Sequence, residues 1–161
     1  MKKYTKILSL IAVLICIVFM SGCAKNITVE YQIDDTVITT QQYAKNNKIK
    51  LAEAPTKEGY TFVGWYDKAT DTKVEEKVKV KGNLVLVGKY EITNYQIIYQ
   101  NEGNQVSNPT TYTMFSEDIT LNNPTRDGYV FLGWYNGDTK VEKIVKGSTG
   151  NLTLVAKWEV V

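Results

Sequence analysis

The chain contains no histidine, and this absence excludes many functions at once. Without imidazole there is no histidine general base, no Ser–His or Cys–His nucleophile pair and no histidine-bound zinc. Cysteine is scarce too, with Cys16 inside an apolar run and Cys23 shortly after it. Two cysteines placed in this way predict neither a structural disulfide nor a redox site.

The chain also lacks a strong excess of charge of one sign, since 19 basic groups face 17 acidic groups in 161 residues. Lys2, Lys3 and Lys6 lie in the first 22 residues, and removal of that segment lowers the basic count to 16 and the formal net charge from +2 to −1. The rest of the chain has no surplus of positive charge with which to bind phosphate backbones. We therefore expect no nucleic-acid partner.

A long hydrophobic run is missing as well, because the apolar stretch Ile7–Met20 has only 14 residues. A helix of that length rises about 21 Å, which is short of a hydrocarbon core of about 30 Å. A cationic start, a short apolar run and small residues at its end are typical of a secretory signal. We predict a signal peptide over residues 1–22, formed as a short helix.

The segment Met20–Cys23 resembles the lipobox of bacterial lipoproteins, with Met20 where leucine is usual. The resemblance implies that Cys23 receives diacylglycerol on its sulfur and becomes the new N-terminus. The alternative is an ordinary cleaved signal in which Cys23 is incidental. Residues 23–26 then form a tether of about 10 Å, so the folded part is expected on the extracytoplasmic face of the cell membrane, within the bacterial envelope.

Most of the remaining chain consists of two copies of one unit. The segment 55–66 returns as 124–135 at an offset of 69, and 82–90 returns as 150–158 at an offset of 68. A unit of this length is too long for a solenoid repeat and is better interpreted as a small domain. We expect a first domain over 27–91 and a second over 92–161.

Hydrophobic residues alternate with polar ones inside each unit. In the first, Ile27, Val29 and Tyr31 share one face of a predicted strand, and Ile97 and Tyr99 do so in the second. A period of two indicates strands, and no stretch shows a convincing helical stripe. We predict a mainly β fold (α+β at most), with no more than a turn or two of helix around residues 41–46 and 116–118.

Two glycines are expected to form bulges. Strict alternation places Phe62 and Trp65 on opposite faces of a strand, although both recur in the second copy. A β-bulge at Gly64, and its counterpart at Gly133, returns each tryptophan to the side of the phenylalanine.

The repeated motif is Gly-Tyr-x-Phe-x-Gly-Trp-Tyr, followed by Gly-Asn-Leu-x-Leu-x-(small)-Lys-(aromatic). The pair resembles the internalin-type B-repeat, or Listeria–Bacteroides repeat, and covers nearly all of residues 27–161 as two tandem copies. The resemblance implies a small β-grasp-like fold, an adhesive or contact role in surface proteins, and no catalytic residues. The motif residues are Gly59, Tyr60, Phe62, Gly64, Trp65, Tyr66, Gly128, Tyr129, Phe131, Gly133, Trp134 and Tyr135.

The tryptophans Trp65 and Trp134 allow two interpretations. Each could stack on a sugar ring, or each could fill the core of a domain that is too small to leave its largest side chains outside. We favour the core, which predicts that substitution by alanine mainly lowers the melting temperature.

The paired acids at 34–35, 75–76 and 117–118 do not indicate catalysis, since neighbouring residues in a strand point to opposite faces and turn carboxylates point into water. No calcium-binding loop pattern is present in the sequence. We expect no metal and no cofactor.

Lysine and valine alternate towards the end of the segment Lys73–Lys81. The favoured interpretation is an edge strand that its lysines protect from edge-to-edge pairing. The alternative is that Lys77, Lys79 and Lys81 contact anionic lipid headgroups or wall polymers.

The sequence therefore predicts a non-enzymatic, lipid-anchored extracytoplasmic repeat protein that acts as a surface or envelope interaction or adhesion module. Its expected partners are the membrane, through lipidated Cys23, and an envelope protein or wall polymer, and it is expected to be a monomer. The alternative function is a lectin-like protein that binds glycans or wall polymers through exposed aromatic rings.

Overall fold

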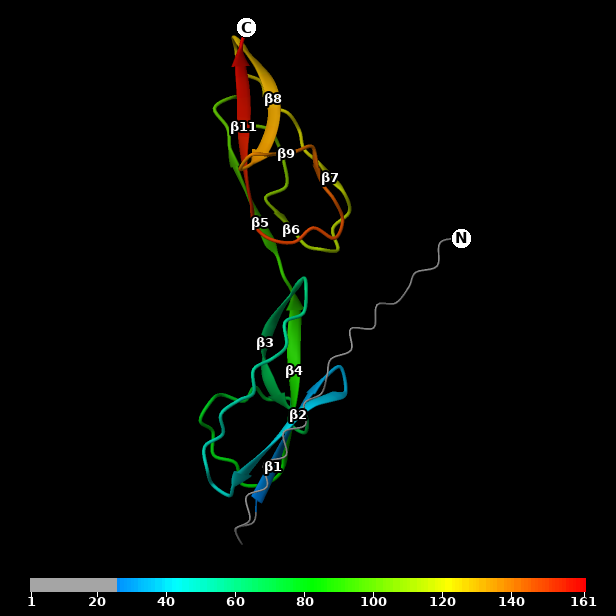
Figure 1. Ribbon diagram of the computed structural model, residues 1–161, viewed down its shortest axis with the longest axis vertical. Helices are drawn as coiled ribbons and strands as arrows, with labels where there is room; N and C mark the ends of the chain where they lie inside the picture. The colour runs from blue at the N-terminus through cyan, green and yellow to red at the C-terminus, as the bar shows by residue number, and fades with distance from the viewer. Residues whose placement is uncertain (1–25) are drawn as a thin grey trace, which may run out of the picture. The chain divides into compact units, whose positions relative to one another are not determined.

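The computed structural model describes residues 26–161 (Figure 1). The predicted signal helix over 1–22 and the proposed lipid site at Cys23 lie outside these residues. The described part contains eleven strands and no helix. The prediction of a mainly β fold is therefore confirmed.

The first repeat forms a four-stranded sheet with the order β2-β1-β4-β3. Its strands are β1 (Asn26–Ile33), β2 (Thr36–Ala44), β3 (Tyr60–Asp67) and β4 (Leu84–Ile92). β1 and β2 make an antiparallel hairpin, whose turn residues Asp34 and Asp35 have φ of 48° and 59°. β1 and β4, the first and last strands of the repeat, pair in parallel at the centre.

The second repeat has a five-stranded sheet, ordered β6-β5-β11-β8-β9, and a separate pair, β10-β7. Its first and last strands again pair in parallel at the centre. The strands are β5 (Tyr95–Gln100), β6 (Thr111–Tyr112), β7 (Ile119–Thr120), β8 (Tyr129–Asn136), β9 (Thr139–Val141), β10 (Lys143–Ile144) and β11 (Leu152–Val160).

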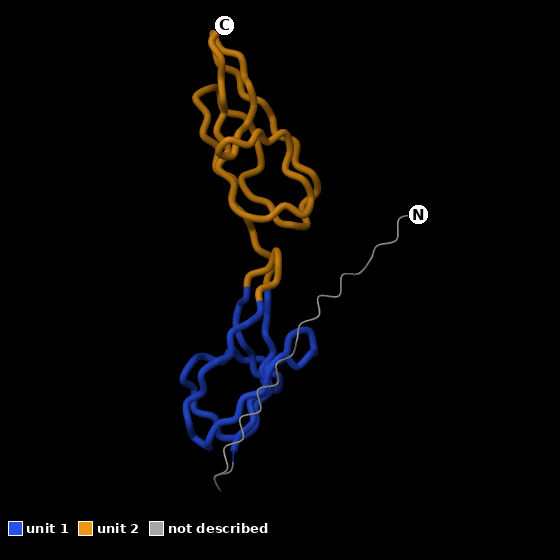
Figure 2. Tube along the Cα trace, in the orientation of Figure 1, with its two compact units in different colours: residues 1–55, 62–90 blue, residues 56–61, 91–161 orange. Residues whose placement is uncertain are grey.

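Contacts divide the chain into two compact units (Figure 2). Unit 1 comprises the described residues up to Pro55 together with Phe62–Tyr90, and unit 2 comprises Thr56–Thr61 and Glu91–Val161. Each unit has its own cluster of buried side chains. The first cluster is Ile27, Val29, Tyr31, Ile49, Trp65, Val80 and Leu86, and the second is Ile97, Tyr112, Leu121, Trp134, Ile144 and Leu154.

The predicted edge strand over Lys73–Lys81 is wrong. Only Lys73 and Lys79 make isolated β-bridges, and Lys77 adopts a φ of 65° in a turn. Val80 is 4% exposed whereas Val78 is 42% exposed, so the alternating valines do not share one buried face. A left-handed residue between them interrupts the extended backbone that a continuous strand requires.

Turns and local loops limit the strands of both repeats. The segment 41–46 forms no helical turn, because β2 continues to Ala44. In the second repeat, the strand that pairs with β5 comprises only Thr111–Tyr112. Between the two strands, Asn101 closes a local loop by accepting from the N–H of Gly103 at 2.8 Å and donating to the carbonyl of Asn104 at 2.8 Å.

Candidate functional site

The two repeat tryptophans lie in the cores. Trp65 in β3 and Trp134 in β8 are each 2% exposed. Their indole N–H groups donate to backbone carbonyls, Trp65 to Ala52 at 2.8 Å and Trp134 to Asn122 at 3.1 Å. A buried ring with its polar group already bonded offers no face for a sugar. Core packing, the favoured interpretation, is what the structure shows.

A bulge brings each tryptophan to its phenylalanine. The pairing of β8 with β11 skips Leu132, which lies between Phe131 and Gly133. Gly133 has a φ of 137° and Gly64 a φ of 147°, values that side chains rarely allow. Each tryptophan ring consequently meets the phenylalanine three residues earlier, with centroids 5.3 Å apart in the first repeat and 5.7 Å in the second. The expected bulge is confirmed in β8, and Gly64 repeats its backbone conformation.

The motif tyrosines are covered by cations. Each repeat places a lysine or arginine over two of its tyrosine rings, an attraction between positive charge and the ring face. The pairs are Lys57–Tyr60, Lys89–Tyr66, Arg126–Tyr129 and Lys157–Tyr135, at 4.8, 4.2, 3.8 and 4.2 Å from the ring centroids. One face of every motif tyrosine is therefore used inside its own repeat.

The motif glycines Gly59 and Gly128 close the turns before β3 and β8. Both have a φ of 76°, and the next residue donates its N–H back across the turn, Tyr60 to the carbonyl of Lys57 at 3.0 Å and Tyr129 to that of Arg126 at 3.1 Å. These residues shape the backbone and offer no chemistry of their own.

The asparagine of the Gly-Asn-Leu segment has a role in both repeats that its sequence did not predict. The Oδ1 atom of Asn83 accepts from the N–H of Thr28 at 3.0 Å, and that of Asn151 accepts from the N–H of Gln96 at 2.9 Å. Each asparagine fastens the start of the first strand to the start of the last, beside the central parallel pair. Its recurrence in both Gly-Asn-Leu segments was the available signal.

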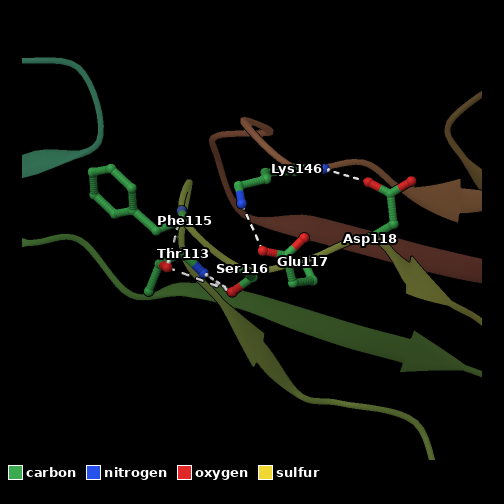
Figure 3. A network of polar contacts seen from close by, with 6 residues as sticks. All are labelled: Thr113, Phe115, Ser116, Glu117, Asp118 and Lys146. Atoms are coloured by element: carbon green, nitrogen blue, oxygen red, sulfur yellow. Dashed lines mark hydrogen bonds and ion pairs between the residues drawn. The ribbon is translucent and has the colours of Figure 1, made fainter.

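In one of the three acidic pairs, Glu117 and Asp118, both carboxylates bind lysines. In the second repeat, Lys146 donates through Nζ to Glu117 at 2.6 Å and through its backbone N–H to Asp118 at 2.9 Å (Figure 3). Lys143 contacts the other oxygen of Asp118 at 2.6 Å. The hydrogen bond from Lys143, followed by that from the Lys146 backbone, lowers the pKa of Asp118 below its ordinary value. These carboxylates are ion-paired rather than poised across a cleft.

Two segments of the first repeat gather lysines on one surface. Lys48 bridges to Lys79 in antiparallel fashion, so that the predicted Lys77, Lys79 and Lys81 lie beside Lys48 and Lys50. All five are exposed. We call these five residues the lysine surface. The sequence pattern of Lys73–Lys81 identified three of these lysines. The other two, Lys48 and Lys50, come from a distant segment that pairs with it through the backbone.

The remaining features offer little chemistry. A pocket of about 370 Å³ is lined by Asp67, Lys68, Ala69, Asn83, Leu84 and Val85, but Asn83 already bonds Thr28 and Lys68 already bonds Gln32 and Asp35. Over residues 26–161 there is no group of acidic or cysteine side chains that could hold a metal ion. The same residues include no helix long and apolar enough to cross a membrane.

Comparison with known proteins connects this geometry to a family. Internalin H of Listeria monocytogenes is 36% identical over 128 residues, which are 74% of this chain and 23% of that protein. A protein of Evansella cellulosilytica described as a Gly-rich membrane protein is 36% identical over 114 residues, 66% of this chain and 13% of that protein. The chain thus spans less than a quarter of the length of these relatives.

A solved pair of SHIRT (streptococcal high identity repeats in tandem) domains 3–4 from a cell surface protein shares 14% identity, with 84% of this chain and 98% of that chain covered. Its TM-score of 0.23 is too low to support an argument. The Listeria–Bacteroides repeat domain matches residues 28–89 and 95–157, which together are most of the chain. The chain therefore belongs to the Listeria–Bacteroides repeat family and carries two copies of the domain.

Proposed function

We propose that this protein is a non-enzymatic interaction module of the bacterial surface, lipid-anchored on the extracytoplasmic face of the membrane. The observation that carries the proposal is the pair of tandem repeats of a family found in internalin-like and membrane proteins. The motif residues that recur in both copies serve their own folds, as buried rings, turn glycines and stacked tyrosines. Such a module acts through its surface.

The anchor is proposed from the sequence, with Met20–Cys23 as the processing site and Cys23 as the acylated residue. Acyl chains contribute about 0.8 kcal/mol for each buried CH₂ group, so several chains hold a small protein firmly. Mass spectrometry of the native product should find a lipid-modified Cys23 at its N-terminus. Cys23→Ser should leave the protein unprocessed and unacylated. An unmodified Cys23 thiol in the mature protein would refute the anchor.

The interaction role is tested with the native lipidated protein. Cross-linking in the cells that make it, followed by capture, should recover a consistent envelope protein or wall polymer. The same capture from cells that make the charge variants of the lysine surface, described below, serves as the matched control. Recovery of nothing beyond lipid would reduce the proposed role to that of a spacer.

Glycan binding through Trp65 and Trp134 is the weaker candidate, because both rings are buried. A lectin-like function therefore needs other, exposed aromatic residues. Phe115 of the second repeat is 46% exposed, but the first repeat has no equivalent exposed ring, so the two repeats share no aromatic binding surface.

A further inference from the structure

The lysine surface is a consequence of pairing between distant segments. Ile49 donates its N–H to the carbonyl of Val78 at 3.0 Å and accepts from the N–H of Lys77 at 3.1 Å. Ile49 is 1% exposed and Val80 is 4% exposed. Because side chains alternate along extended backbone, the lysines on either side of these two residues point away from the core.

This arrangement places like charges opposite each other. Lys48 is the bridge partner of Lys79, and like charges facing each other across a ladder are destabilising. Among the ion pairs of residues 26–161, none involves a residue of the lysine surface. The repulsion is therefore left for solvent, salt or an external anion to relieve.

The second repeat has no such repulsion between like charges at the equivalent position. The loop before β3 and the loop before β8 can be aligned at Ala52 and Asn122, whose carbonyls accept the tryptophan N–H groups. In this alignment, Asp118 occupies the position of Lys48. There Asp118 binds Lys143 at 2.6 Å, and the adjacent Glu117 binds Lys146 (Figure 3). The fold thus accommodates a neutralised version of this surface, and only the first repeat leaves it basic.

The position of the lysine surface in the fold suggests its partner. β1 begins at Asn26, opposite Ala44, directly before the loop that carries Lys48 and Lys50. Asn83, two residues after Lys81, bonds Thr28 near the same end of β1. The lysine surface therefore lies close to the end of the sheet at which the chain enters. If Cys23 is acylated, as proposed above, this end is held against the bilayer.

We propose that the lysine surface docks on anionic phospholipid headgroups and holds the first repeat against the membrane. The attraction acts over a Debye length of about 8 Å at physiological salt, which a tether of a few residues keeps within reach. Each lysine near an anionic leaflet contributes roughly five-fold in binding. The proposal rests on the proposed Cys23 anchor only for the orientation of the first repeat at the membrane. The attraction between the lysine surface and anionic headgroups does not require that Cys23 be acylated.

The test uses residues 24–161, because both buried clusters lie between Ile27 and Leu154 and are complete in that fragment. Its binding to phosphatidylglycerol-containing vesicles is compared with binding to pure phosphatidylcholine, at low and high salt. We expect binding only to the anionic vesicles, with loss at high salt. Lys79→Gln with Lys81→Gln should weaken it on the order of twenty-fold.

Two further variants sharpen the test. Lys140→Gln with Lys157→Gln removes the same charge from the second repeat and should weaken binding by about two-fold or less. Lys48→Asp with Lys50→Thr installs the residues of the second repeat and should abolish binding while raising the melting temperature, since it removes the repulsion across the bridge.

Equal losses in the two double-glutamine variants would overturn the proposal, because they would show attraction by net charge alone. Binding to polyglycerol phosphate without binding to vesicles would overturn it too and assign the surface to a wall polymer. Either result would leave the Cys23 anchor, which mass spectrometry tests separately, unaffected.

Discussion

Three aromatic side chains of the repeats donate hydrogen bonds from their polar atoms to backbone carbonyls. Trp65 and Trp134 donate to carbonyls, and Tyr90 donates through its hydroxyl to the carbonyl of Pro55 at 2.6 Å. Trp158, the counterpart of Tyr90 in the second repeat, is the exception. Its buried Nε1 has no hydrogen-bond partner within residues 26–161. An unsatisfied buried donor costs about 1–3 kcal/mol.

This difference predicts that two phenylalanine substitutions in one repeat have unequal costs. Trp134→Phe removes a bonded N–H and leaves the Asn122 carbonyl without its donor, whereas Trp158→Phe removes the donor that is unsatisfied. We expect Trp134→Phe to lower the free energy of unfolding by about 1–3 kcal/mol more than Trp158→Phe. Urea unfolding followed by far-UV circular dichroism measures both, and equal costs would contradict the assignment.

The bulge glycine predicts a backbone effect. Gly64→Ala places an alanine in a backbone conformation with a φ of 147°. The new Cβ would lie 2.6 Å from the Lys73 side chain, which can move aside. We expect a loss of about 1–3 kcal/mol from backbone strain. Gly82→Ala is the control in the same repeat, since Gly82 has no positive φ and nothing within 4 Å. Thermal unfolding should leave the control within about 0.5 kcal/mol of the parent, and a similar loss in both would argue against the bulge.

At the level of elements, the β7–β10 pair of the second repeat is joined by charges that the first repeat lacks. Its Asp118 has a lowered pKa in the folded state. A carboxylate of this kind adds stability above its unfolded pKa, and the contribution is lost as the pH falls through the folded value. The ion pair should therefore matter at neutral pH and vanish in acid.

We expect Asp118→Asn to lower the melting temperature of the second repeat at pH 7. The difference from the parent should close as the pH falls below the ordinary value of 3.8. Asp138→Asn, in the same repeat, is the control, because Asp138 is in none of the ion pairs of residues 26–161, and it should change the melting temperature at pH 7 less than Asp118→Asn does. Melting curves between pH 7 and the acid limit decide the matter, and a difference that persists in acid would mean that the charge of Asp118 is not the cause.

Sequence pattern predicted the elements with long, regular alternation and failed where a turn interrupts it. β1, with Val29 and Tyr31 fully buried, follows directly from its period of two. The Lys73–Lys81 segment shows similar alternation, but Lys77 turns the chain there. The pattern records local preference, whereas the pairing of Lys48 with Lys79 depends on contacts between segments far apart in the chain.

For the whole molecule, recurrence was the most informative signal. Two copies of one motif predicted two interiors, and the buried side chains do form two clusters. The parallel pairing of first and last strands could not be predicted, because no local pattern specifies the register between distant strands. What recurs in the two copies stabilises the fold. What differs, above all the lysine surface, is where we expect function to lie.

Trp65 and Trp134 fill two separate cores. Hydrogen exchange of Trp134→Ala, followed by mass spectrometry, tests this most directly. The substitution should cost about 3–5 kcal/mol. Amides from β5 to β11 should lose protection from exchange while those from β1 to the start of β4 keep it, and Trp65→Ala should give the reverse pattern. Loss of protection throughout residues 26–161 in either variant would contradict the separation of the two cores.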